Sequence, residues 1–351
     1  MNVSEGRFDD FERNESEDTA EESLLGWGII FIVFVIAVAL WFYAIPAYMH
    51  LFIQSSQPGG RGEFDIPGDG TIPGRREGEM AVVFFDVGYG DGILIQGPDN
   101  STALIDGGEG NNPVEEDVEA YDWAYELYLP LFDRLGITHL QKLINLVPSS
   151  HHMGVQPDLI AHELVEVENL YLTGYPATFS NYRQLEVEAQ NAGIPTEELE
   201  QTMELDFGPG VESKLLFGRS GAASPDEASH VIYLKFGTVS LLFPGDLPGE
   251  MEAEMVLEWG DSLDADVLKL AKHGHRDSTS MELLEYVNPS HAVISVDSEN
   301  PIFAPGDETL DRLQRAGISG TSIYRTDRQG HIILFTDGRR IRFETGAFPF
   351  L

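Results

Sequence analysis

Two adjacent histidines, His151 and His152, are the residues whose types and spacing first suggest chemistry in this chain. They follow an apolar run that begins at Leu143 and stops at Pro148, and Gly154 closes the segment. This pattern predicts a buried strand that delivers a polar loop to one edge of a sheet. Ligands and catalytic groups often lie at that edge in α/β proteins, because a rigid strand holds a loop whose side chains face an open crevice. Imidazole is a common metal ligand, so both histidines are candidates for metal binding.

Strand and helix patterns alternate around these histidines. Strands are expected at residues 81–87, 93–96, 102–106, 143–147, 168–172, 214–217, 231–236, 239–243, 265–270, 292–295, 332–335 and 340–343. Helices are expected at residues 127–135, 181–192, 250–259, 281–287 and 308–316. The strand at 239–243 ends in a turn with a carboxylate, Asp246, and the strand at 265–270 leads into Lys272-His-Gly-His. Interleaved strands and helices favour an α/β fold with layered αββα packing.

The composition bears on the source organism and on which residues could bind a metal ion. Asp plus Glu number 59 against 21 Lys plus Arg, a formal net charge of -38. Such a surface repels anions and itself in ordinary salt, whereas at ~1 M salt the screening length falls to about 3 Å. We therefore infer a halophilic source, and the charge disfavours a nucleic-acid partner. The chain has no cysteine, so any metal must be held by histidine and carboxylate groups.

The N-terminal part predicts attachment to a membrane. Residues 1–22 are polar and acidic, as in a disordered tail. Leu24–Ile45 is apolar, and about 20 such residues cross a bilayer, so residues 23–53 predict a transmembrane helix with an interfacial extension. A buried core helix or a cleaved signal fits less well, since the run is apolar all round and no basic segment precedes it. Arg7 and Arg13 before the helix favour an external C-terminal domain. Residues 54–78 are a Gly/Pro-rich linker, and 79–351 form the folded domain.

Several motifs in one order carry a resemblance to a known family. They are Phe85-Asp-Val-Gly-Tyr-Gly-Asp-Gly, Leu104-Ile-Asp-Gly-Gly, Phe243-Pro-Gly-Asp-Leu, Ala265-Asp-Val-Leu-Lys-Leu and Tyr324-Arg-Thr-Asp. Across residues 80–345 the chain resembles the metallo-β-lactamase-fold domain of ComEC-type DNA-uptake proteins. The resemblance implies a four-layer αββα sandwich and, in active members, two metal ions that activate water for hydrolysis. The turn carboxylates Asp86, Asp91 and Asp106 support the architecture whether or not the domain is active.

The family's ligand motifs are only partly kept. Active members carry His-x-His-x-Asp-His after the central strand, and here Val147 and Ser149 replace the first two histidines. His151 occupies the position of the aspartate, and Lys272 and Ala304 replace two later histidines. The resemblance leaves four candidate ligands for a single zinc ion: His151, His152, Asp246 and His273. The alternative is that the two adjacent histidines cap a strand end and that Asp246 accepts backbone hydrogen bonds. His275 is expected to be a solvated loop residue.

Because the replaced residues are those that the chemistry uses, our preferred hypothesis is a non-catalytic binding or assembly module without a cofactor. One alternative is a mononuclear zinc hydrolase of phosphodiesters, and another is a structural subunit of a DNA-uptake or cell-surface complex. The expected partners are the membrane and other proteins. Five arginines of the C-terminal hairpin could contact phosphates, although a solvated hairpin is favoured: Arg325, Arg328, Arg339, Arg340 and Arg342.

Overall fold

The computed structural model describes residues 68–109, 123–162, 165–176, 180–219, 221–298, 300 and 302–346. They lie in one compact unit that begins at Ile66. The expected tail and transmembrane segment lie outside these ranges, so both stay predictions. Within the described ranges no helix has the length and apolar character needed to cross a bilayer. Only residues 68–78 of the expected linker are described, and there Ile72 is buried, with its N–H donating to Gln96.

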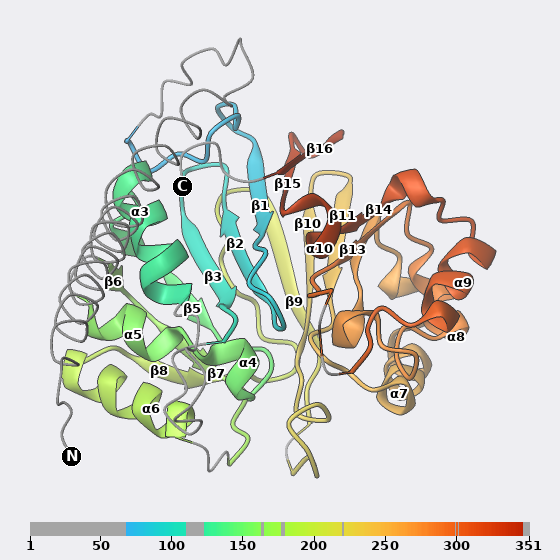
Figure 1. The fold of residues 1–351 in the computed structure, drawn as a ribbon, viewed down its shortest axis with the longest axis horizontal. Helices are drawn as coiled ribbons and strands as arrows, with labels where there is room; N and C mark the ends of the chain where they lie inside the picture. The colour runs from blue at the N-terminus through green and yellow to red at the C-terminus, as the bar shows by residue number, and fades with distance from the viewer. Residues whose placement is uncertain are drawn as a thin grey trace, which may run out of the picture. The chain divides into compact units, whose positions relative to one another are not determined.

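The first sheet has eight strands in the order β16-β15-β1-β2-β3-β5-β7-β8 (Figure 1). Its strands are β1 (Met80–Phe84), β2 (Gly92–Gln96), β3 (Thr102–Asp106), β5 (Lys142–Ile144), β7 (Leu170–Leu172), β8 (Thr196–Glu198), β15 (His331–Thr336) and β16 (Ile341–Gly346). Strands β3, β5, β7 and β8 run parallel, whereas β16, β15, β1, β2 and β3 pair antiparallel. The C-terminal hairpin thus returns to pair with the first strand. A separate parallel pair joins β4 (His139–Leu140) to β6 (Glu166–Val167).

The second sheet has six strands in the order β14-β13-β12-β11-β10-β9. Its strands are β9 (Val211–Phe217), β10 (Val231–Phe236), β11 (Val239–Phe243), β12 (Val267–Lys269), β13 (His291–Ile294) and β14 (Ile323–Arg325). Strands β11 to β14 are parallel, so their carboxyl ends lie at one edge. Strands of β-branched and other apolar residues that are buried on both faces, such as β11, are typical of a sheet covered on each side.

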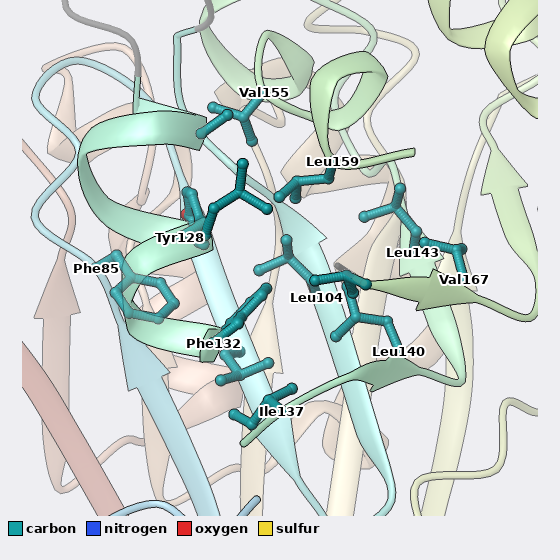
Figure 2. Packing of buried hydrophobic residues seen from close by; sticks show 14 of the residues in the cluster. Phe85, Leu104, Tyr128, Phe132, Ile137, Leu140, Leu143, Val155, Leu159 and Val167 are labelled. Carbon is teal, nitrogen blue, oxygen red and sulfur yellow. The ribbon is translucent and has the colours of Figure 1, made fainter. Parts of the chain in front are cut away.

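Three apolar clusters define four layers. One lies between the two sheets and includes Phe84 and Phe243, whose rings stack at 6.1 Å. A second lies under α3 (Leu129–Leu135), α5 (Gln156–Ala161) and α6 (Ser180–Ala192), and Figure 2 shows part of it, including Phe132 and Leu159. The third lies under α7 (Gly249–Trp259), α8 (Met281–Val287) and α9 (Asp307–Arg315). Helices therefore cover the outer face of each sheet, and the expected α/β class with αββα layering describes the fold.

The remaining helices are short. They are α4 (Ser150–Met153), α10 (Thr326–Gln329), a π-helical turn at Ala124–Tyr128 and 3₁₀ turns at Gly260–Leu263, Ala271–Gly274 and Gly320–Ser322. His151 and His152 lie on α4. Our expectation of a loop there was wrong in this respect: the strand ends at Ile144, and a single helical turn carries the histidines.

Candidate metal centre

Both sheets contribute to one cluster of polar side chains. On the first sheet, Asp106 ends β3, and the segment after β5 leads to α4 with His151 and His152. On the second sheet, Asp246 follows β11 and His273 follows the neighbouring parallel strand β12. The carboxyl ends of these strands meet at the same edge of the sandwich, where the fold places chemistry-bearing loops.

The structure brings together the four residues that the sequence analysis named. His151, His152, Asp246 and His273 each offer one ligand atom, and these atoms all lie within 4.8 Å of one another. The side chains of His152 and His273 are 0% exposed and that of Asp246 is 2% exposed, whereas His151 is half-buried. The cluster is therefore nearly sealed from solvent except at His151. Metal binding itself stays a prediction.

Hydrogen bonding fixes the tautomer of His273. Its Nδ1 lies 3.0 Å from the backbone oxygen of Ser295, which can only accept, so Nδ1 carries the proton. Its Nε2 is then a bare lone pair, buried and without a hydrogen-bond partner, 3.6 Å from Oδ1 of Asp246. Histidines that bind metals are commonly oriented in this way, with one ring nitrogen bonded to a carbonyl and the other directed at the ion.

His152 lies between two carboxylates. Its Nδ1 is 3.0 Å from Oδ2 of Asp106, and its Nε2 is 3.1 Å from Oδ2 of Asp246. Burial opposes charge on this ring, yet the two carboxylates raise the pKa of His152 well above its usual value. Burial likewise opposes charge on Asp246, but the neighbouring histidines hold the pKa of this carboxyl well below its usual value. Without an ion, a proton on His152 therefore balances the charge of Asp246.

An aromatic ring covers the more open side of the cluster. Tyr89 stacks on His151 with ring centroids 4.6 Å apart and lies 4.9 Å from the ring of His273. Its loop approaches α4 closely, since a Cβ on Gly90 would lie 1.9 Å from the backbone oxygen of His151. Burial and the positive charge on His152 lower the pKa of His151 to about 3, so this ring is neutral. A neutral imidazole is the form that binds a metal ion.

Further charged residues contact the candidate ligands or lie next to them. Asp106 accepts from the N–H of Leu146 at 2.8 Å as well as from His152. Asp91 pairs with the ammonium of Lys269, and both side chains are nearly fully buried. Asp91, Asp106 and His152 also each offer one potential ligand atom, and these three atoms lie within 4.8 Å of one another. Lys269 already supplies a positive charge to this second group. We therefore infer that Asp91 and Asp106 position the candidate ligands and do not bind an ion themselves.

The four ligands fit a divalent zinc ion. Three imidazoles and one carboxylate are acceptable zinc ligands in a chain without cysteine. Two buried atoms, Nε2 of His273 and Oδ1 of Asp246, lack a hydrogen-bond partner, and such orphaned groups are costly unless something binds them. A metal ion held here would satisfy both atoms at once.

The replaced family positions lie beside this cluster. Val147 is fully buried in the core between the sheets, and Ser149 is 8% exposed with an unpartnered hydroxyl. Ala304 is 8% exposed, and its N–H donates to the side chain of Asn300. Lys272 pairs with Asp226. Among the described residues, His275 joins neither group of candidate ligands.

Sequence reasoning missed two contributors. Tyr89 stands between glycines in a turn, where an aromatic residue carries no sign of what it touches. Lys269 ends an otherwise apolar strand, and that was a usable signal, because a lysine is almost never buried unless it is paired.

Comparison with known proteins places the sequence near competence proteins. The chain is 28% identical over 262 residues to ComE operon protein 3 of Bacillus subtilis, covering 73% of this chain and 33% of that protein. It is 27% identical over 255 residues to competence protein ComA of Neisseria gonorrhoeae, covering 72% and 32%. The aligned region thus spans about a third of the length of these relatives. No protein-family model matches the chain.

Solved structures give only distant likenesses. YhfI of Bacillus subtilis, described as a metallo-β-lactamase fold protein, has a TM-score of 0.43 at 12% identity, covering 70% of this chain and 95% of its own. CmlA of Streptomyces venezuelae, a diiron β-hydroxylase, has a TM-score of 0.44 at 14% identity, covering 72% and 53%. At these TM-scores we draw no argument from either structure. The sequence relatives confirm the resemblance recognised from the motifs: over about three quarters of its length the chain is similar to ComEC-type competence proteins.

Proposed function

We propose that this chain is a metal-dependent hydrolase with a single divalent ion, most simply zinc, held by His151, His152, Asp246 and His273. One observation carries the proposal: the lone pair of His273 and an oxygen of Asp246 are buried without partners at the point where the other two histidines converge. The proposed reaction is hydrolysis of a phosphodiester. It reverses our preference for a non-catalytic module, because four convergent ligands are more than strand capping requires.

The ion would supply a water molecule with a pKa near 7 and polarise the oxygen of the substrate. The residues of the chain would hold this ion and orient its ligands. Asp106 fixes the ring of His152, and the backbone oxygen of Ser295 fixes that of His273. Tyr89 shields the rings of His151 and His273 from bulk water, which strengthens electrostatic interactions within the site.

The test is metal content together with activity in the purified full chain. We expect about one zinc per chain by elemental analysis, and hydrolysis of bis(4-nitrophenyl) phosphate that a chelator abolishes. His152→Ala should lose both. Because the ring of His152 is fully buried, His151→Ala serves as the variant that is more certain to fold. His139→Ala, at a half-buried histidine on β4, is the matched control and should keep both properties.

A second candidate keeps the earlier hypothesis of a binding or assembly module, and the side chains at three family ligand positions favour it. Val147 and Ala304 cannot bind a metal, and Ser149 does so poorly. This candidate predicts a folded chain without bound metal in the parent and in every histidine variant. About one zinc per parent chain, lost on substitution of His151, would exclude it.

We also propose that residues 24–45 anchor the chain in a membrane with the folded domain outside the cell. The uncharged sequence from Leu24 to Ile45 and the two arginines before it support this arrangement. Protease added to intact cells should then remove the domain. Protection of the domain in intact cells, with cleavage after lysis, would refute the external location.

A further inference from the structure

A partly exposed lysine adjoins one of the candidate metal ligands along the chain. Lys272 directly precedes His273, and its Nζ pairs with Oδ2 of Asp226 at 2.5 Å. The two side chains are 25% and 29% exposed, in contrast to the buried side chains of His273 and Asp246. The ion pair is therefore accessible to solvent, whereas the side chains of His273 and Asp246 are not.

Hydrogen bonds hold this ion pair beside Asp246. The N–H of Lys272 donates to the backbone oxygen of Gly245 at 3.1 Å, and the N–H of Asp246 donates to Oγ of Ser229 at 3.2 Å. Together with the ion pair from Lys272 to Asp226, these bonds join three segments, at residues 226–229, 245–246 and 272. The two partners of Lys272, Gly245 and Asp226, come from different segments, so the fold restrains the position of this lysine.

The backbone at Lys272 is unusual in a way that also indicates a ligand-binding role. Lys272 and His273 have φ values of 49° and 54°, the left-handed region that non-glycine residues seldom adopt. Two such residues in succession persist only where the surroundings impose them, and such conformations cluster at active sites and ligand clamps. The strained turn presents one candidate metal ligand and one cation side by side.

Lys272 differs from its charged neighbours, because it is a partly exposed cation among carboxylates. Lys269, the other lysine near the centre, is buried and paired with Asp91. Burial raises the pKa of the Tyr89 phenol, and the neighbouring carboxylates of Asp246 and Asp226 raise it further, so both carboxylates lie near this ring. In a chain of net charge -38, an anion needs a specific positive group to approach this site.

We propose that Lys272 binds an anionic oxygen of the substrate, which replaces Asp226 as the partner of its ammonium. A phosphoryl oxygen is favoured over a carboxylate, because lysine acts as a point charge, whereas a planar carboxylate suits the fork of an arginine. This deepens the proposed function, since it rests on hydrolysis at the neighbouring centre and names the group that recognises the substrate's charge.

Isothermal titration of the purified full chain with inorganic phosphate, and separately with acetate, tests the proposal. Lys272→Gln should weaken phosphate binding roughly tenfold, whereas Lys272→Arg should largely keep it. Asp226→Asn should tighten binding several-fold, since the competing carboxylate is removed. Lys214→Gln, at an exposed lysine on β9, is the matched control for loss of one charge and should leave binding unchanged.

Elemental analysis of the same preparations separates this proposal from the proposed function. Loss of phosphate binding in Lys272→Gln with zinc retained supports a substrate-binding lysine. Unchanged phosphate binding in Lys272→Gln, weaker binding in Asp226→Asn, tighter binding of acetate than phosphate, or no phosphate binding by the parent chain would each overturn it, whatever the zinc content. Absence of zinc from the parent would instead refute the hydrolase.

Discussion

The buried ion pair between Lys269 and Asp91 gives the sharpest prediction about stability. The two side chains are 1% and 2% exposed, and they join β12 of the second sheet to the turn before β2 of the first. Removing one partner of such a pair leaves a charge buried without compensation, at a cost of about 3–5 kcal/mol. Lys269→Met should therefore destabilise the domain by about that amount.

The lower end of that range is expected, because Asp91 keeps two other neighbours. Nδ1 of His152 and Nδ1 of His273 each lie 3.8 Å from its carboxylate. The double variant Asp91→Asn with Lys269→Met should recover much of the loss, since a neutral pair needs no compensation. A coupling energy of at least about 2 kcal/mol between the two positions follows from this argument.

The assay is guanidinium chloride unfolding of the full chain, followed by tryptophan fluorescence, for the parent, both single variants and the double variant. Lys235→Met, a half-buried lysine on β10, controls for the change in net charge and for loss of a lysine side chain. Strictly additive losses in the double variant would show that the pair does not act as a unit. A loss below about 1 kcal/mol in Lys269→Met would refute the reasoning directly.

Three further predictions concern pH, the aromatic cover and salt. Burial lowers the pKa of His331 to about 4, so the free energy of unfolding should be highest above pH 6.5 and fall between pH 6.5 and 4, by up to about 3 kcal/mol. His331→Gln should flatten that part of the pH profile in urea titrations, and an unchanged slope would contradict the assignment. Tyr89→Ala should weaken zinc binding several-fold in competition with a chelator, whereas Tyr89→Phe keeps the ring contacts and should bind as the parent does; equal losses in both would refute ring stacking as the cause. Raising salt from about 0.1 to 1 M should raise the melting temperature, because screening relieves the repulsion of the acidic surface, and melting that does not depend on salt would argue against a halophilic source.

Much of the architecture was predictable, because apolar runs and glycine turns are local signals. The strands at Val231–Phe236 and Val239–Phe243 and the helix at Met281–Val287 lie where the sequence placed them. The short strand Thr196–Glu198 was missed, since its exposed residues Thr-Glu-Glu show no apolar pattern. The helical turn under His151 and His152 was missed as well, because four residues cannot show a period of 3.6.

The four candidate ligands could be predicted from the sequence, but the contacts that orient them could not. Family motifs identify Asp246 and His273, since each follows a recognisable strand and turn. The tautomer of His273, by contrast, depends on a backbone oxygen of Ser295, 22 positions away along the chain. The pairing of Lys269 with Asp91 spans 178 positions, and a contact of that kind arises only from tertiary packing.

Residues from both sheets form the candidate site, and this has a consequence for how the molecule assembles. His152 follows a strand of the first sheet, whereas Asp246 follows a strand of the second sheet and lies 94 positions later, so the complete site forms only once the two sheets have packed together. A chain that has formed only its first sheet would hold at most part of the coordination sphere. A bound ion would then fasten one half to the other, and at a free concentration 100 times its Kd it would add about 2.7 kcal/mol to the stability of the closed sandwich. Metal supply would thus govern how long the two halves stay together as well as what the site can do.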